Sequence, residues 1–85
     1  MMKNEENLYY LVSQNIKLQR KLKGWTQVKL ALKSNISYDY LKKIETKSGS
    51  NKQFSLDTIQ KIANALDIDV RLLFNPLDKK QDDED

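Results

Sequence analysis

Residues 26–45 of the chain read TQVKLALKSNISYDYLKKIE, and the spacing of residue types in this stretch determines the fold. Apolar residues recur at intervals of three and four, which is typical of helices that bury one side. We expect two short helices, over residues 27–34 and 38–47, with Thr26 and Ser37 as their N-cap residues. Only a tight turn remains to join them.

Two helices joined by so short a turn can cross closely only if particular positions obey steric rules. Ala31 faces the predicted crossing, where a larger side chain would push the helices apart. Asn35 lies in the turn, where a left-handed backbone is expected, and asparagine tolerates that conformation best after glycine. Ile36, Leu41 and Ile44 then point back into the core. This spacing is typical of the helix-turn-helix unit.

Helical spacing also dominates the rest of the chain, so the predicted fold class is all-α. Further helices are expected over residues 7–23, 56–66 and 70–74. Gly24 ends the first of them. Its apolar side is formed by Leu8, Leu11, Val12, Ile16, Leu18 and Leu22. Ser55 and Asp69 are the N-caps of the last two. The result is a compact five-helix domain.

The four helices with predicted N-caps share one further feature. An apolar residue precedes each cap, and a second apolar residue lies five positions after the first. The pairs are Trp25 with Leu30, Ile36 with Leu41, Phe54 with Ile59, and Ile68 with Leu73. This is the hydrophobic-staple arrangement, which fixes the angle at which the chain enters a helix. It also favours a packing role for Trp25 over stacking on a base.

The residue types that the chain lacks exclude several kinds of chemistry. It has no cysteine and no histidine, which excludes disulfides, thiolate-ligated zinc, thiol catalysis and imidazole general bases. No nucleophile–base pair can be assembled from the remaining residues, and no spaced acidic cluster suggests a metal site. We therefore expect neither an enzyme nor a cofactor-binding protein.

A length of 85 residues predicts a single domain. No stretch approaches the roughly 20 apolar residues needed to span a bilayer. Residues 1–6 are polar and lack the apolar run of a signal peptide. We expect a cytoplasmic protein without membrane contact, which the absence of cysteine suits.

The net charge of +3 is distributed unevenly along the chain. Residues 78–85 hold five acids and two lysines, which leaves 13 basic and 7 acidic residues in residues 1–77. The predicted organisation is a basic helix-turn-helix domain over 1–77 and a disordered acidic tail over 78–85. A basic body suits a polyanionic partner, although a well-solvated surface explains the same charge.

A set of residues from Leu11 to Phe74 carries a resemblance to a known family. Its members are Ile16, Arg20, Gly24-Trp25-Thr26-Gln27, Leu30-Ala31, Ile44-Glu45, Ser55-Leu56-Asp57-Thr58-Ile59, Ile62-Ala63-Asn64-Ala65-Leu66 and Leu73-Phe74. In these positions the chain resembles the Cro/repressor-like (XRE-type) transcriptional regulators of bacteria and phages. The resemblance implies a lambda-repressor-like domain that binds double-stranded DNA.

The resemblance also implies roles for individual residues. Those expected to meet base edges in the major groove are Ser37, Tyr38, Asp39, Lys42 and Lys43. Those expected to contact backbone phosphates are Thr26, Gln27, Lys47, Asn51 and Lys52. Arg20 and Glu45 match an ion pair of the family. In the family this pair orients the recognition helix, which corresponds here to the predicted helix over residues 38–47. Gln27 matches the family's phosphate-binding glutamine at a helix N-terminus, where free N–H groups face the anion.

Some of these residues have more than one interpretation. Asp39 either accepts a hydrogen bond from cytosine N4 or stabilises the first turn of its helix. Tyr38 offers a hydroxyl or packs on a thymine methyl group, and Lys42 donates to guanine O6 and N7. Leu32 is either an exposed apolar residue or an additional core contact. Thr46-Lys47 replaces the Asn-Gly common in relatives.

The predicted function is that of a repressor, or of a controller like those of restriction–modification systems, which binds a pseudo-palindromic operator as a homodimer. The dimer surface is expected to involve Leu72, Phe74, Pro76 and Leu77. The alternative is an antitoxin or another protein-interaction module, whose main partner is a protein and whose covering segment is the acidic tail.

Overall fold

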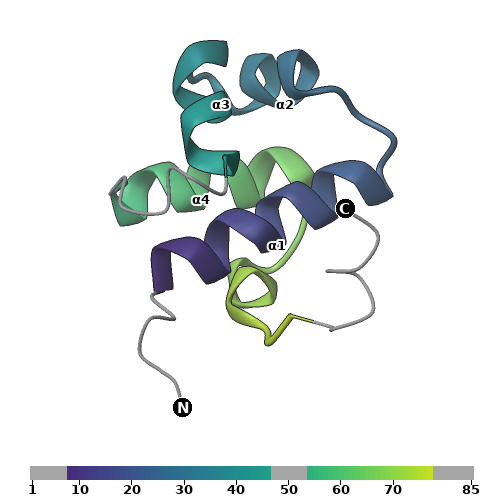
Figure 1. The fold of residues 1–85 in the computed structure, drawn as a ribbon. Coiled ribbons are helices and arrows are strands. Elements are labelled where there is room, and N and C mark those ends of the chain that lie inside the picture. The colour runs from purple at the N-terminus through teal and green to yellow at the C-terminus, as the bar shows by residue number, and fades with distance from the viewer. Residues whose placement is uncertain (1–7, 47–53, 78–85) are drawn as a thin grey trace.

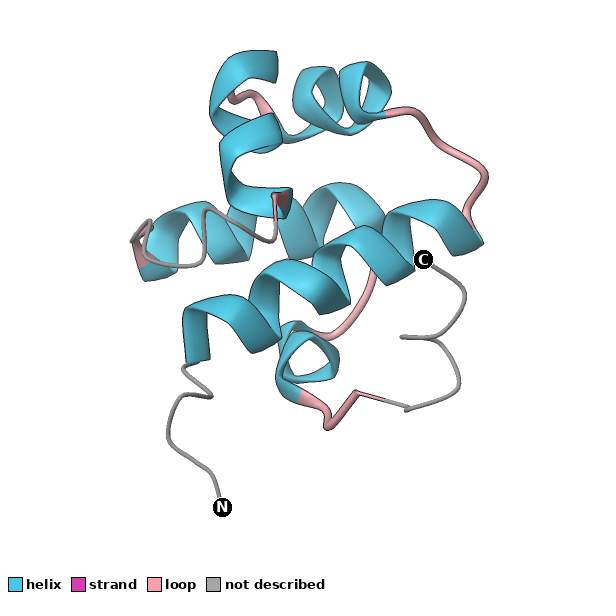
Figure 2. Cartoon of the chain, in the orientation of Figure 1, coloured by secondary structure: helices cyan, strands magenta, loops and turns pink. Residues whose placement is uncertain are grey.

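The computed structural model describes residues 8–46 and 54–77, and every regular element within them is helical. These elements are α1 (Leu8–Leu22), α2 (Gln27–Ser34), α3 (Tyr38–Glu45), α4 (Leu56–Leu66) and the 3-10 helix η2 (Val70–Phe74). Figure 2 shows helices and loops only in this part of the chain. The all-helical prediction is therefore confirmed.

The prediction of five helices is not confirmed as stated, because the last one is a single 3-10 helix rather than an α-helix. The described ranges thus contain four α-helices. The segment is only five residues long, and Pro76 follows soon after it. Tight 3-10 turns are common in such short pieces, and the residue before a proline is disfavoured in the helical conformation.

The helices form layers that separate the helix pair α2–α3 from η2. In Figure 1, α1 and α4 cross the middle of the molecule, α2 and α3 lie above them, and η2 lies below. The helix pair can therefore present one face to a partner while η2 supports the opposite side of α1.

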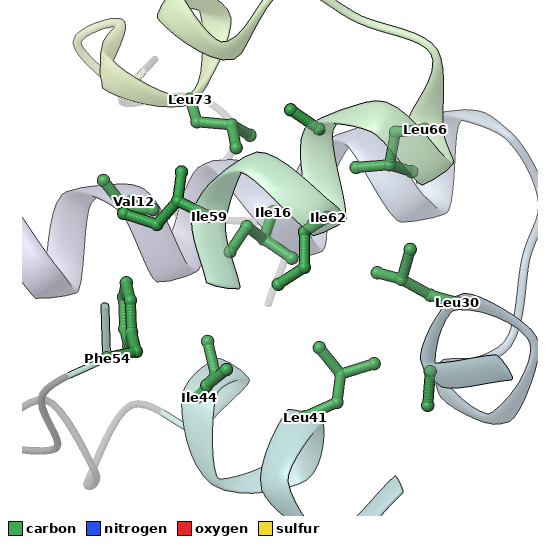
Figure 3. Packing of buried hydrophobic residues seen from close by; sticks show 12 residues of the cluster. Val12, Ile16, Leu30, Leu41, Ile44, Phe54, Ile59, Ile62, Leu66 and Leu73 are labelled. Atoms are coloured by element: carbon green, nitrogen blue, oxygen red, sulfur yellow. The ribbon is translucent and has the colours of Figure 1, made fainter. Parts of the chain in front are cut away.

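A single hydrophobic core holds these layers together. Every described element contributes to it, and the side chains converge between α1, α3 and α4 (Figure 3). Its members are Val12, Ile16, Leu30, Ala31, Leu41, Ile44, Phe54, Ile59, Ile62, Ala63, Leu66 and Leu73. All second members of the predicted staples are buried here. Of the first members, Phe54 is buried, and Trp25, Ile36 and Ile68 pack against the core while partly exposed.

The predicted apolar side of α1 is wrong at both ends of the helix. Leu8 and Leu22 are 62% and 70% exposed, whereas Val12 and Ile16 are buried. Leu8 and Leu22 are the first and last residues of α1, and the residues of α1 that are buried lie between positions 12 and 20. The helix is longer than the core that it covers, so its terminal leucines project beyond the packed elements.

All four predicted N-caps are present as hydrogen bonds. Thr26 and Ser37 accept from the backbone N–H groups of Lys29 and Tyr40, each at 3.0 Å. Ser55 accepts from that of Thr58 at 3.1 Å and Asp69 from that of Arg71 at 2.9 Å. Each cap satisfies a donor of the first turn that has no carbonyl partner within the helix, which fixes where the helix begins.

Residues in the left-handed conformation end three of the helices. Gly24 follows α1 with φ 73°, and Asn35 follows α2 with φ 59°, as predicted. Asp67 follows α4 with φ 61°, a role that the sequence analysis did not assign. Asparagine and aspartate adopt this conformation more readily than other non-glycine residues, because their short polar side chains can bond locally.

Asn15 ties α1 to η2 and was missed by the sequence analysis. It is 2% exposed. Its side-chain amide donates to the carbonyl oxygens of Leu11 at 3.1 Å, Leu73 at 3.0 Å and Asn75 at 2.8 Å. Two of these carbonyls belong to the end of η2 and the residue after it, where helical partners run out. The amide thus fixes the short 3-10 helix against α1.

The N-cap of η2 leads to a prediction about acid. The side-chain hydrogen bonds from Arg71, with the hydrogen bond from its backbone N–H, lower the pKa of Asp69 from 3.8 to about 2. A lowered pKa in the folded state means that this stabilisation is complete above about pH 4 and is lost as pH falls towards 2. We expect the Asp69 carboxyl carbon to titrate near pH 2 in an NMR experiment.

Two variants control this measurement. In Arg71→Ala the Asp69 titration should return towards its ordinary midpoint. Asp69→Asn keeps a capping side chain but removes the titrating group, so its unfolding temperature should depend less on pH between 4 and 2 than that of the parent protein. An ordinary Asp69 midpoint in the parent protein would contradict the role given to Arg71.

Candidate nucleic-acid interface

The helices α2 and α3 cross as the sequence predicts. Ala31 is 3% exposed at the packed side of α2. On α3, Leu41 and Ile44 are buried in the core, and Ile36 in the preceding turn is half-buried. The turn itself is closed by hydrogen bonds from Asn35 N to Leu32 O at 3.2 Å and from Ile36 N to Ala31 O. The helix α3 is therefore held from behind by the core and by the closed turn.

The opposite side of α3 presents all five residues that were predicted to read bases. Ser37, Tyr38, Asp39, Lys42 and Lys43 are exposed. The side chains of Asp39 and Lys43 are 74% and 62% exposed. Because residues three and four apart share one face of a helix, these groups form a continuous polar surface on the outside of α3. The surface is predominantly basic, with one carboxylate.

The side chains on this surface form two pairs, each four residues apart. The ammonium group of Lys42 lies 5.0 Å from the centre of the Tyr38 ring, a cation–π contact. The ammonium group of Lys43 lies 3.8 Å from a carboxylate oxygen of Asp39. Exposed pairs of this kind stabilise a protein by only about 0–1 kcal/mol, so a ligand can separate them at little cost.

A buried ion pair connects the end of α3 to α1. Glu45 is 3% exposed, and its two carboxylate oxygens accept from Arg20 Nε at 2.9 Å and Nη2 at 2.8 Å. Arg20 also donates from Nη1 to the carbonyl oxygen of Trp25 at 2.8 Å. This is the pair that the family resemblance implied. Its bidentate geometry fixes the end of α3 relative to α1 and to the chain entering α2.

Gln27 belongs to the same buried network, a contact that the sequence analysis missed. Its side-chain amide donates to Glu45 Oε1 at 3.0 Å, while the residue was predicted to hold a backbone phosphate. The backbone N–H of Gln27 lies in the first turn of α2, where it has no carbonyl one turn earlier. A phosphate bound at Gln27 would therefore contact this backbone N–H group, because the side-chain amide of Gln27 already donates to Glu45.

The other predicted phosphate contacts divide into two groups. Thr26 is exposed, and its hydroxyl oxygen accepts from Lys29 N, which leaves the hydroxyl hydrogen available to donate. Lys47, Asn51 and Lys52 lie outside the described residues, as does the acidic tail over 78–85.

Two lysines beside Trp25 add positive charge near the start of α2. The ammonium groups of Lys23 and Lys29 lie 5.3 and 5.1 Å from the indole ring. The sequence analysis assigned no DNA contact to either residue. Trp25 precedes the extended N-cap Thr26 and so lies outside α2, which means that helical spacing could not have indicated this arrangement.

Two other kinds of site were searched for in the described ranges. Within residues 8–46 and 54–77, no three acidic side chains lie close enough together to hold a metal ion. None of the helices formed by these residues is both long enough and apolar enough to cross a membrane.

Comparison with known proteins assigns this arrangement to a family. Residues 16–73 match the helix-turn-helix family, a span that includes both crossed helices and most of the described chain. The chain belongs to the helix-turn-helix family. Together with the relatives below, the match confirms the predicted resemblance to Cro/repressor-like (XRE-type) regulators.

This helix-turn-helix protein is 33% identical over 73 residues to the transcriptional regulator SinR of Bacillus licheniformis. The matched region covers 86% of this chain and 64% of SinR, so the chain spans less than two thirds of that regulator.

Two solved structures share the helix-turn-helix fold over most of this chain. The hypothetical transcription factor NHTF from Neisseria superposes with a TM-score of 0.76 at 26% identity, covering 96% of this chain and 91% of NHTF. The restriction-modification controller protein C.AhdI from Aeromonas hydrophila superposes with a TM-score of 0.70 at 33% identity, covering 78% and 96% respectively. The names of these relatives describe regulators and a controller, not enzymes.

Proposed function

We propose that this chain is a cytoplasmic, non-catalytic transcriptional regulator that binds a short operator in double-stranded DNA as a homodimer. The observation that carries the proposal is the exposed surface formed by Tyr38, Asp39, Lys42 and Lys43, braced from behind by Leu41 and Ile44. Rigid helices that present polar side chains in this way fit the major groove of B-DNA.

The chemistry of the surface suggests which base pairs it reads. Lys42 and Lys43 can donate to guanine O6 and N7, and Asp39 can accept from cytosine N4. To contact bases, Lys42 must separate from the Tyr38 ring, and Lys43 must separate from Asp39. The Lys43–Asp39 ion pair is exposed and 3.8 Å long, so its separation costs little free energy. We propose operators whose half-sites contain G·C pairs at the positions facing α3.

Contacts to phosphates would orient the reading helix. The Thr26 hydroxyl, the free N–H groups at the start of α2 and the ammonium group of Lys29 are grouped at one end of that helix. Gln27 contributes from the same end through its backbone. Such contacts fix the position of a protein on the duplex without reading its sequence.

We propose that dimerisation uses Leu72, Phe74, Pro76 and Leu77. Leu72 and Phe74 are 38% and 37% exposed, so both side chains are accessible to a second copy. Two copies would read half-sites about 34 Å apart, one turn of B-DNA, and so multiply the specificity of a module that touches few base pairs. The regulator is a repressor or a controller of the restriction–modification kind.

Selection of bound sequences from a random DNA pool tests this function. We expect an enriched pseudo-palindrome whose half-sites are about one helical turn apart. Failure to enrich any sequence, while the protein remains folded, would contradict the proposal.

Replacing Lys42 with alanine tests which group reads a base. At the affected base pair we expect the preference to fall by about 1–3 kcal/mol, because a donor to guanine is lost while the fold is unchanged. Binding to the selected operator and to versions changed at single positions gives the measurement. If Lys42→Ala weakens binding equally on every sequence, Lys42 contacts a phosphate instead. Lys33→Ala, on the exposed side of α2, is the control.

A further inference from the structure

Two exposed lysines flank the single tryptophan of the chain. The ammonium groups of Lys23 and Lys29 lie 5.3 and 5.1 Å from the centre of the Trp25 ring, and both residues are exposed. Because both ammonium groups lie against one ring, their positive charges form one cluster, the Lys23–Trp25–Lys29 cluster. An aromatic face stabilises such cations but does not neutralise them.

The carboxylates of the described helices leave this cluster charged. Within residues 8–46 and 54–77, the ion pairs join Glu45 to Arg20, Asp39 to Lys43, Asp57 to Lys61 and Asp69 to Arg71. None of the pairs formed inside these two ranges involves Lys23 or Lys29. The cluster therefore offers two positive charges to an anionic partner.

Residues 78–85 supply carboxylates that the proposed function leaves unused. This segment has five acids and two lysines, so its charge is opposite to that of the cluster. The carboxylate oxygens of the segment and the phosphate oxygens of DNA are both anionic acceptors for an ammonium group. A lysine occupied by one of them is therefore less available to the other.

The point at which the chain leaves η2 puts the acidic segment within reach of the cluster. The carbonyl oxygen of Asn75 accepts from the Asn15 amide at 2.8 Å, which fixes this part of the chain beside α1. Lys23 comes eight residues after Asn15, directly beyond α1, and helical rise makes that about 12 Å along the axis. The seven residues from Asn75 to Asp82 can span about 23 Å. The excess is about the width of a helix, so the chain can also pass around α1.

We propose that residues 78–85 bind the Lys23–Trp25–Lys29 cluster of the same chain and compete there with the DNA backbone. Three observations support this: the cluster lacks a carboxylate partner among the described helices, the charges are complementary, and the segment is long enough to reach. The acidic segment then acts as a built-in brake on DNA binding. The competition rests on the proposed function, because Lys29 is a proposed phosphate contact, but the contact itself requires no DNA.

Paramagnetic relaxation enhancement in the full chain, without DNA, tests the contact. The chain has no cysteine, so Asp85→Cys provides one position for a nitroxide label. At low salt we expect strong broadening of the amide signals of residues 23–29 and of the Trp25 indole N–H. At about 1 M salt the signals should recover, because the Debye length falls to about 3 Å. The amides of residues 56–59, which Figure 1 places at the other end of the molecule, are the reference.

DNA affinity at low salt tests the competition. Replacing the five acids of residues 78–85 with the amides of the same size should raise the affinity about three- to tenfold, since each exposed ion pair contributes little. The gain should be smaller in a chain that carries Lys23→Gln and Lys29→Gln, because the segment has then lost its partner. Lys33→Gln, on the exposed side of α2, is the matched control and should keep the full gain.

The outcomes separate this inference from the proposed function. Absence of broadening at residues 23–29, or equal broadening over the whole surface, overturns the contact. A gain in affinity that is unchanged by Lys23→Gln with Lys29→Gln overturns the competition, because the acids then act through overall charge alone. In either case selection of an operator from random DNA would leave the DNA-binding proposal standing. Failure to select an operator, with the broadening present, would contradict the proposed function and support the contact.

Discussion

Replacing Glu45 with alanine is expected to lower the free energy of unfolding by about 3–5 kcal/mol. Glu45 is 3% exposed, and its carboxylate accepts from Arg20 at 2.8 and 2.9 Å and from Gln27 at 3.0 Å. Its removal leaves the Arg20 side chain, which is 10% exposed, with an uncompensated charge inside the protein. The total stability of a small domain is about 5–15 kcal/mol, so the variant should be partly unfolded at modest denaturant concentrations.

Denaturant unfolding followed by circular dichroism measures the loss. The control is Asp57→Ala, which breaks the exposed pair with Lys61, where the Asp57 side chain is 79% exposed. Pairs of that kind contribute about 0–1 kcal/mol, so the control should unfold nearly as the parent does. Equal effects of the two substitutions would contradict the importance given to burial.

A double variant identifies the cause of the instability. Arg20→Met combined with Glu45→Leu removes both charges and fills the space with apolar side chains. Because the cost arises from one unpaired buried charge, the double variant should be more stable than Glu45→Ala alone. If the double variant is less stable than Glu45→Ala, the ion pair with its hydrogen bonds to Gln27 and Trp25 contributes more to stability than the unpaired charge costs.

The parts of the fold that the sequence predicted well depend on local chemistry. The N-caps at Thr26, Ser37 and Ser55, and the left-handed turn at Asn35, each involve a side chain acting within a few residues of itself. Such interactions involve residues that are close together in the sequence, so the first residue of each of these helices could be predicted. The crossing at Ala31 follows because only a small side chain fits there.

The parts that were missed depend on contacts between distant segments. Asn15 bonds to carbonyl groups that lie 58 and 60 residues further along the chain, and nothing near it in the sequence indicates this. Gln27 and Glu45 lie 18 residues apart, and their hydrogen bond exists only once α2 and α3 have crossed. The exposure of Leu8 and Leu22 likewise reflects where other elements stop covering α1.

The candidate site lies between these two extremes. Helical spacing correctly placed Tyr38, Asp39 and Lys42 on one exposed side of α3, since that depends on helix geometry alone. The pairing of Asp39 with Lys43 follows from the same spacing but was not drawn from it. An exposed carboxylate beside a lysine can both stabilise the first turn of α3 and accept a hydrogen bond from a base, so the two roles predicted for Asp39 are compatible.

Leu30→Ala and Leu32→Ala are expected to differ sharply in their effect on the free energy of unfolding. The two substitutions are chemically identical and lie two positions apart on α2. Leu30 is 0% exposed in the core, and its truncation should lower the free energy of unfolding by about 2–5 kcal/mol through lost burial and the cavity left behind. Leu32 is 77% exposed, so its truncation should change that free energy by about 0.5 kcal/mol at most.

The same pair of variants distinguishes stability from DNA contact. At low temperature, where Leu30→Ala remains folded, its affinity for the operator should approach that of the parent, because Leu30 supports α3 from the core and touches no base. An affinity that falls with stability already intact would mean that the cavity lets α3 shift. Leu32 is exposed on the outer side of α2, so the structure excludes it from the core. A large loss of stability in Leu32→Ala would contradict this placement.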